Sequence, residues 1–188
     1  MGYVGLLLAA GAGVRMGRPK ALVEGWLGSS LTALLDGGCA EVSVVLGAAA
    51  DRARALLDEA TRADACLASV RVVVAEEWAS GMGASMRAGL ESLDRAHGAA
   101  LVHLVDLPDV GADVIRRVGG HAAIDVLARA SYHAVPGHPV LLGRDHWAPA
   151  AATLTGDEGA RAYLRAHDVT LVECGDLAEG RDVDRPQP

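Results

Sequence analysis

The feature that most restricts the fold of this chain is the regular alternation of apolar, β-branched runs with helical patterns over its first 105 residues. The apolar runs, which we expect to be strands, occupy residues 3–9, 41–47, 70–74 and 99–105. Continuous apolar character is typical of strands covered on both faces. Because strand and helix alternate three times with short connections, the sequence predicts a mostly parallel α/β sheet with right-handed crossovers, in one domain over residues 1–188.

Capping residues and stop signals set the expected helix boundaries. Ser29 or Ser30 is expected to cap the first helix, which Gly37-Gly38 would end. Asp51 is expected to cap the second helix, and Asp157 a late helix through residues 160–164.

The second half of the chain has weaker periodicity, because alanine-rich segments discriminate poorly between helix and strand. Residues 126–132 and 140–142 are predicted as strands on either side of a turn at Pro136-Gly137-His138-Pro139. A helix at residues 112–118 and a strand at 169–174 complete the expected elements.

The order of the strands locates the expected binding edge. Ligands of parallel sheets bind beyond the carboxyl ends of the strands, where the strand order reverses. In a 3-2-1-4 order, the strands that end at Ala9 and Val105 are neighbours. This order would bring the loop after Ala9 beside Asp106.

A glycine-rich, basic loop follows the first strand, and its residues 11–20 read Gly-Ala-Gly-Val-Arg-Met-Gly-Arg-Pro-Lys. Glycines let backbone N–H groups converge on an anion, while Arg15, Arg18 and Lys20 add positive charge. Of the 17 lysine and arginine residues, Lys20 is the only lysine. A compact ammonium with three donors suits the bridging of phosphate oxygens. The loop therefore predicts a phosphate-binding site, with a solvated lysine after a turn as the alternative.

Carboxylates at the same edge predict a magnesium site. Asp106 follows a strand directly, and Mg²⁺ prefers oxygen ligands, usually one or two carboxylates together with substrate phosphates. Asp182 and Asp184 lie two residues apart and would point to one side of an extended chain, so either one could supply a second ligand. A turn or cap role for Asp106 and a solvated acidic tail are the alternatives.

Two histidines and two helix starts are further candidates for ligand contacts. His103 lies inside the fourth strand and is expected to be packed, whereas His138 in the Gly-His-Pro turn either contacts a ligand or only shapes the turn. Residues 80–85 and 155–161 each precede a helix, whose free N–H groups can bind ribose, base edges or phosphate.

Composition excludes several classes of protein. The net charge of −7 leaves no basic stripe for nucleic acid or an anionic membrane surface. Cys39, Cys66 and Cys174 are odd in number and without a C-x-x-C pair, as in reduced proteins rather than disulfide frameworks or zinc sites. The N-terminal apolar run is too short for a membrane span and has no leading positive charge. We therefore expect a cytoplasmic protein with no nucleic-acid or membrane partner.

Six blocks of the sequence, in order, resemble the nucleotidyltransferases that make molybdopterin dinucleotide cofactors, the MobA-like NTP transferases. The first block, which looks like the signature loop of that family, is Leu8-Ala9-Ala10-Gly11-x-Gly13-x-Arg15-Met16-Gly17-x-Pro19-Lys20. The others are Gly81-Met82-Gly83-x-Ser85-x-Arg87-x-Gly89-Leu90, Asp106-Leu107-Pro108, Gly137-His138-Pro139-Val140-Leu141, Gly156-Asp157-x-Gly159-Ala160-Arg161 and Asp182-Val183-Asp184-x-Pro186. Ala9-Ala10-Gly11 resembles the form associated with CTP, and the fourth and fifth blocks look like the molybdenum cofactor cytidylyltransferase branch.

The resemblance implies a three-layer α/β/α, Rossmann-like sheet of the glycosyltransferase-A type. It also implies Mg²⁺-dependent transfer of CMP from CTP to molybdopterin or molybdenum cofactor, with release of pyrophosphate, and a client molybdoenzyme or its chaperone as a protein partner. The residues implied to bind the nucleotide are Leu8, Ala9, Ala10, Gly11, Gly13, Arg15, Lys20, Gly81, Ser85 and Asp106. The implied catalytic residues are Arg15, Lys20 and Asp106, the implied metal ligands Asp106 and Asp184, and the implied acceptor-binding residues His138, Asp157 and Arg161.

Three features depart from the family pattern. Arg185 stands in place of a small threonine before Pro186, and Gln187-Pro188 follows where relatives continue with acidic residues and a helix. The turn before Gly137 also lacks its customary basic neighbour. These departures bear on the second metal ligand and on the contacts to the pterin.

Other functions stay open beside this one. Within the class, the alternatives are a GTP-using guanylyltransferase or another NTP transferase acting on a small phosphorylated acceptor. From other classes, they are an NAD(P)-dependent oxidoreductase and a non-catalytic cofactor carrier. Gly11-x-Gly13 is compatible with a dinucleotide turn, but Pro19 interrupts the helix that should follow and no acidic residue closes the second strand. A kinase-type phosphate loop is excluded, because Arg18-Pro19 separates Gly17 from Lys20.

Overall fold

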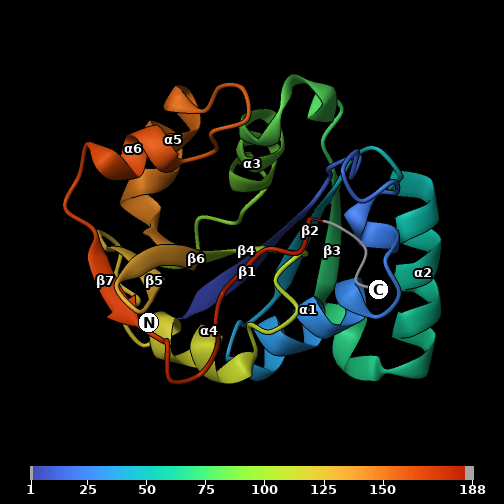
Figure 1. Ribbon diagram of the computed structural model, residues 1–188, viewed down its shortest axis with the longest axis horizontal. Coiled ribbons are helices and arrows are strands. Elements are labelled where there is room, and N and C mark those ends of the chain that lie inside the picture. Colours follow the sequence, from blue (N-terminus) through green and yellow to red (C-terminus); the bar gives the residue numbers. More distant parts are fainter. Residues whose placement is uncertain (1, 185–188) are drawn as a thin grey trace.

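Seven strands pair into one mixed sheet in a computed structural model that describes residues 2–184 (Figure 1). The strands are β1 (Tyr3–Ala9), β2 (Val42–Leu46), β3 (Val70–Val74), β4 (Ala99–Leu104), β5 (Leu127–Tyr132), β6 (Val135–Gly143) and β7 (Thr170–Glu173). Their spatial order is β3-β2-β1-β4-β6-β5-β7. The first four strands run parallel in the predicted order, which is thereby confirmed. β6 runs antiparallel to β4 and β5, and β7 runs parallel to β5.

Helices cover both faces of this sheet. The α-helices are α1 (Trp26–Asp36), α2 (Ala50–Ala63), α3 (Met82–Glu91), α4 (Ala112–Gly119), α5 (Trp147–Thr153) and α6 (Arg161–Arg165). Short 3₁₀ helices are η1 (Lys20–Leu22), η2 (Ala65–Ser69), η3 (Trp78–Ser80) and η4 (Arg144–His146). Helices α1, α2 and α4 pack in one core, and α3, α5 and α6 in the other (Figure 1). The three-layer α/β/α architecture is therefore confirmed.

The two cores explain the continuous apolar runs of the central strands. In β1, Leu6 and Leu8 belong to the core under α3, while Leu7 and Ala9 belong to the core over α1 and α4. Alternate side chains of a strand point to opposite faces, so both sets must be apolar. Each buried leucine contributes about 1.5–3 kcal/mol by its removal from water.

Two expected helix caps are wrong. Helix α1 begins at Trp26 after Gly25, which has a φ of 78°, so Ser29 and Ser30 lie inside the helix. Helix α2 is capped by Ala49, and Asp51 lies in its first turn, where its charge favours the helix dipole without a capping hydrogen bond.

The hairpin between β5 and β6 turns earlier than the sequence predicts. Residues 136–139 lie within β6, and the turn consists of His133 and Ala134, whose φ angles are 51° and 66°. Two left-handed residues match the twist of a two-residue hairpin. Their conformation is supported by the Glu173 carboxylate, which accepts hydrogen bonds from the backbone N–H of His133 at 2.8 Å and of Ala134 at 3.2 Å.

The segment from 147 to 165 also differs from expectation. Helix α5 was not predicted, because its alanine-rich sequence with Pro149 has no clear period. Helix α6 is capped by Ala160 and not by Asp157. In the described part of the chain, no helix combines the length and the apolar character that crossing a membrane requires.

Candidate active site

A cavity of about 820 Å³ opens at the carboxyl ends of β1 and β4. Its walls come from the loops after these strands, from the start of α3, from β6 and from residues 157–164. All residues that the family resemblance implies for nucleotide, acceptor and metal line this one cavity. The sequence therefore predicted which residues come together, while their individual roles stay a prediction.

The loop after β1 folds back tightly on itself. Gly13 has a φ of 62°, and a Cβ atom there would lie 1.8 Å from the carbonyl oxygen of Arg18. Only glycine fits this position. The fold-back carries the chain through Pro19 into η1, so that Lys20 stands at the start of a 3₁₀ turn and faces the cavity.

Lys20 lies between two carboxylates. Its Nζ donates hydrogen bonds to Asp106 Oδ2 at 2.5 Å and to Asp184 Oδ1 at 2.6 Å. The side chains of Lys20 and Asp106 are only 19% and 13% exposed, so this contact is largely shielded from water. The predicted neighbourhood of the basic loop and Asp106 is confirmed, and Asp106 lies in the turn after β4 with its side chain largely buried.

The charges around Lys20 shift its pKa and that of Asp184. Burial by itself would lower the pKa of Lys20, but the hydrogen bonds to Asp106 and Asp184 outweigh it and raise the pKa. The hydrogen bond from Lys20, followed by that from Arg15 at 2.6 Å, lowers the pKa of Asp184. Both groups are therefore charged at neutral pH.

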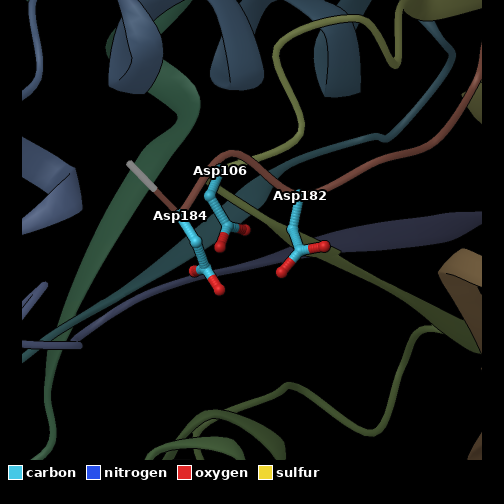
Figure 2. Close-up of side chains that lie close together, drawn as sticks. All are labelled: Asp106, Asp182 and Asp184. Carbon is cyan, nitrogen blue, oxygen red and sulfur yellow. The ribbon is translucent and has the colours of Figure 1, made fainter. Parts of the chain in front are cut away.

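Three aspartates form a candidate metal centre. One carboxylate oxygen each from Asp106, Asp182 and Asp184 lies within 4.8 Å of the others, and Figure 2 shows the three side chains pointing toward a common space. Carboxylate oxygens are the ligands that small divalent cations prefer, so the three residues fit a divalent ion. Cationic side chains already pair with two of the three carboxylates, so the cluster attracts positive charge. Both candidates for the second ligand, Asp182 and Asp184, belong to the cluster.

The C-terminal tail carries two of these aspartates across the molecule. Figure 1 follows this segment, in red, from β7 past α4 toward the end of β1. Asp109 Oδ2 accepts hydrogen bonds from the backbone N–H of Glu179 and of Gly180, both at 2.9 Å. The backbone N–H of Val183 donates to the carbonyl oxygen of Asp106 at 3.0 Å. The departures expected at 185–188 lie outside the described residues.

Sequence reasoning missed Asp109 as a positioning residue. It stands three residues after Asp106, in the same loop, but its partners are backbone groups 70 and 71 residues away. Gly180 also shapes the path of the tail. Its φ is 62°, and a Cβ atom there would lie 2.0 Å from the ring of Tyr132. A glycine before the Asp-Val-Asp segment was the only available signal.

The two glycine-containing helix starts meet at the cavity. The backbone N–H of Gly83 donates to the carbonyl oxygen of Gly156 at 2.8 Å. A Cβ at Gly81 would lie 2.5 Å from that same backbone and 2.7 Å from Asp157 Oδ1. Glycine at 81 therefore allows the segment of Ser85 to approach the segment of Arg161.

His103 lies inside the sheet, whereas His138 lines the cavity. His103 is fully buried in β4 and neither of its ring nitrogens has a hydrogen-bond partner among the described residues, so its expected packing in the sheet is confirmed. Burial, and to a lesser extent His138, lowers the pKa of His103 to about 3. Burial, then the charges of Arg129 and Arg161, lowers the pKa of His138 to about 4. Both rings are neutral at pH 7.

Comparison with known proteins decides the family. Residues 5–171 match the family of the MobA-like NTP transferase domain. The chain belongs to the MobA-like NTP transferase family. The predicted resemblance is confirmed at this level, and the MobA-like chain has the fold of the nucleotidyltransferases.

Relatives of this MobA-like protein carry different names. It is 37% identical to a nicotine blue oxidoreductase from Paenarthrobacter nicotinovorans, over 96% of this chain and 91% of that protein. The crystal structure of Rv0371c from Mycobacterium tuberculosis H37Rv is 26% identical, covers 98% of this chain and 94% of its own, and superposes with a TM-score of 0.76. A further structure of Rv0371c is a complex with manganese, with a TM-score of 0.71, 26% identity and coverage of 97% and 94%.

A nucleotidyl transferase from Methanothermobacter thermautotroptrophicus, Mth528, shares the fold. It is 20% identical, with a TM-score of 0.77 over 98% of this chain and 92% of its own. The manganese complex of the Rv0371c protein and the three aspartates of this chain agree in pointing to a divalent metal site.

Proposed function

We propose that this protein is a Mg²⁺-dependent nucleotidyltransferase that transfers CMP from CTP to the terminal phosphate of molybdopterin or molybdenum cofactor. One observation carries the proposal. A glycine-rich loop, its single lysine and three aspartates from distant parts of the chain converge on one cavity. Phosphate chemistry uses these groups together.

The chain would act by positioning and by neutralising charge. The backbone N–H groups of residues 11–15 would bind the triphosphate of CTP, and Lys20 and Arg15 would contact its oxygens. An oxygen of the acceptor phosphate attacks the α-phosphorus, the bond from that phosphorus to the β-phosphate oxygen breaks, and pyrophosphate leaves. Two polyanions must meet in this step, so the cations offset their repulsion and stabilise charge on the leaving group.

Asp106, Asp182 and Asp184 would hold Mg²⁺, with coordination completed by phosphate oxygens and water. The bound ion would supply a Lewis acid that neutralises phosphate charge. The same three carboxylates would repel a triphosphate if no cation stood between them, and this supports a metal-dependent reaction.

Preference for CTP is supported by the small residues at the start of the loop. Ala10 lines the cavity and is 5% exposed, so its methyl group occupies space that a glycine would leave open for a larger base. A pyrimidine fits the narrower space better than a purine.

Oxidation–reduction is the second candidate, because the relative that is 37% identical over nearly the whole chain is named an oxidoreductase. A hydride transfer has no use for three carboxylates beside a phosphate loop, so the site favours nucleotidyl transfer. The two reactions have different products and can be measured on one preparation.

The experiment measures pyrophosphate released from CTP, GTP, ATP or UTP with Mg²⁺, with and without molybdopterin. A parallel sample receives NADH or NADPH with nicotine blue and is followed by absorbance. Release that depends on molybdopterin and is fastest with CTP supports the proposal. Dye reduction without release supports the oxidoreductase, and CTP binding with neither reaction supports a carrier.

A further inference from the structure

Two arginines stand in the part of the cavity formed by β5, β6 and α6, away from the metal centre. Arg129, in the middle of β5, donates hydrogen bonds from Nε and Nη2 to the carbonyl oxygen of Gly137 at 3.1 and 2.9 Å. Arg161 is the first residue of α6. Both line the cavity, and Arg129 is half-buried.

Neither arginine forms an ion pair with a carboxylate among residues 2–184. Arginines elsewhere in that range do, including Arg15, Arg117 and Arg165. The chain has 24 acidic and 17 basic residues, so there are more than enough acidic side chains to pair with every arginine. Burial, followed by the nearby charge of Arg161, lowers the pKa of Arg129.

The arginines stand where two hollows join. A second hollow of about 150 Å³ shares Arg129, Pro136, Arg161 and Leu164 with the main cavity, and its other walls are Arg165, Val169 and Leu171. A ligand that reaches this point meets cations beside an apolar wall. Arginines without a carboxylate partner at such a junction are typical of an anion subsite.

This place is separate from the site of the triphosphate. The strand order puts β6 between β4 and β5, and at the ordinary strand spacing β5 is roughly 10 Å from β4. Lys20 contacts Asp106 directly after β4. The Lys20 ammonium is held at Asp106 and the Arg129 guanidinium at Gly137 of β6, so the two cations are held at different strands of the sheet.

We propose that Arg129 and Arg161 form a second anion subsite, which binds a phosphate or carboxylate group of the acceptor remote from the phosphate that attacks. The assignment to the acceptor rests on the proposed function, whereas the anion site itself does not. The acceptor class is then a molecule with two anionic ends separated by an apolar or planar body. The neutral ring of His138 lies beside the subsite and can donate one further hydrogen bond.

The binding test uses inorganic phosphate and thermal unfolding at constant ionic strength, in a Lys20→Ala background that disables the triphosphate loop. Phosphate in place of chloride should raise Tm, and Arg161→Gln should remove more than about half of that rise by loss of a charge-assisted contact. Arg161 makes no side-chain hydrogen bond in the described part of the chain, so this variant keeps the fold. Arg52→Gln, exposed on α2 and outside both hollows, removes the same charge elsewhere, so it is the matched control and keeps the rise.

Two further experiments distinguish a phosphate ligand from a carboxylate ligand, and test the anion subsite separately from the proposed function. Succinate in place of phosphate shows whether carboxylates are accepted. In the transfer assay, Arg161→Gln and Arg129→Lys should raise the KM for the acceptor about tenfold and leave the KM for CTP unchanged. An equal phosphate-dependent rise in Tm with and without Arg161→Gln overturns the subsite. Absence of transfer by the wild type overturns the proposed function and leaves the phosphate result standing.

Discussion

At the scale of single residues, the environment of Lys20 stands out. It is the only lysine of the chain, and its ammonium pairs with Asp106 and Asp184. The same two carboxylates belong to the candidate metal centre. A cation entering that centre competes with Lys20, which then becomes available to phosphate oxygens. Lysine suits such an exchange because its four-carbon stem is flexible and its charge is compact.

Replacing Lys20 tests this role directly. Lys20→Ala should reduce the turnover of nucleotidyl transfer by about 100-fold or more, the scale of losing one electrostatic stabiliser of the transition state. Pyrophosphate release under saturating CTP is the measurement. Arg18→Ala is the control, since Arg18 belongs to the same loop but does not line the cavity. Equal rates for Lys20→Ala and the wild type would remove Lys20 from the mechanism.

Glu173 is a second residue with an unusual environment. Hydrogen bonds from Ser131 first, and then from the backbone N–H groups of Gly175, His133 and Ala134, lower its pKa to about 2. The unfolded chain has the ordinary value of 4.5. A carboxylate with a depressed folded pKa stabilises the protein above the unfolded value, and this stabilisation is lost as the pH falls through the folded value.

Glu173→Gln should therefore lower Tm at pH 7, because the amide is a weaker acceptor for the N–H groups of the turn. The deficit relative to wild type should narrow as the pH falls from about 4.5 toward about 2, where the native carboxylate also takes up its proton. Thermal unfolding followed by circular dichroism over that range measures it. Glu59→Gln, exposed on α2, provides the comparison. A deficit of constant size across the range would contradict the role of ionised Glu173.

At the scale of elements, the tail after β7 carries two of the three aspartates of the candidate metal centre. It is held by Asp109 at Glu179 and Gly180 and by Asp106 at Val183. A residue that fixes the chain segment carrying a metal ligand commonly affects the affinity for the metal without contacting the ion itself. Asp109 is such a residue, because it fixes the backbone two residues before Asp182.

Asp109→Ala should weaken Mn²⁺ binding by about tenfold, within the range found for such supporting residues. Titration of Mn²⁺ by electron paramagnetic resonance measures the affinity. Asp109→Asn retains a side-chain oxygen that can accept both N–H groups, so it should restore near wild-type binding. If Asn and Ala bind Mn²⁺ equally well, the hydrogen bonds of Asp109 do not position the tail.

At the scale of the whole molecule, divalent cations should stabilise the fold. Binding to the native state alone adds about 2.7 kcal/mol to the free energy of unfolding when the ion is at 100 times its dissociation constant. Mg²⁺ or Mn²⁺ should therefore raise Tm, and EDTA should reverse the rise. Asp184→Asn should abolish most of the increase, and Asp113→Asn on the outer face of α4 should keep it. A rise that survives Asp184→Asn would place the ion elsewhere.

The sequence predicted the first half of the molecule better than the second, for physical reasons. β1 to β4 are long apolar runs between helices, so their positions and order follow from burial on both faces. The turn at His133 and Ala134 has neither glycine nor asparagine, and it depends on a carboxylate from β7. Local patterns cannot reveal a turn whose support lies 40 residues away.

The residues of the candidate site also fall into predictable and unpredictable ones. Lys20 belongs to the loop after β1 and Asp106 to the turn after β4, so their meeting was predictable from strand order. Arg129 and Asp109 were not, because each acts through backbone groups of another segment, the carbonyl of Gly137 and the N–H groups of Glu179 and Gly180. Side-chain to backbone contacts of this kind leave no pattern in the sequence.

The path of the tail has a consequence for biosynthesis. Arg15 and Lys20 leave the ribosome more than 160 residues before Asp184, with which both pair. A chain that has formed its first strands but has not yet docked this tail lacks two of the three aspartates of the candidate metal centre. If the three aspartates hold a metal ion, that site would be complete only after residue 184 has been synthesised and the tail has docked.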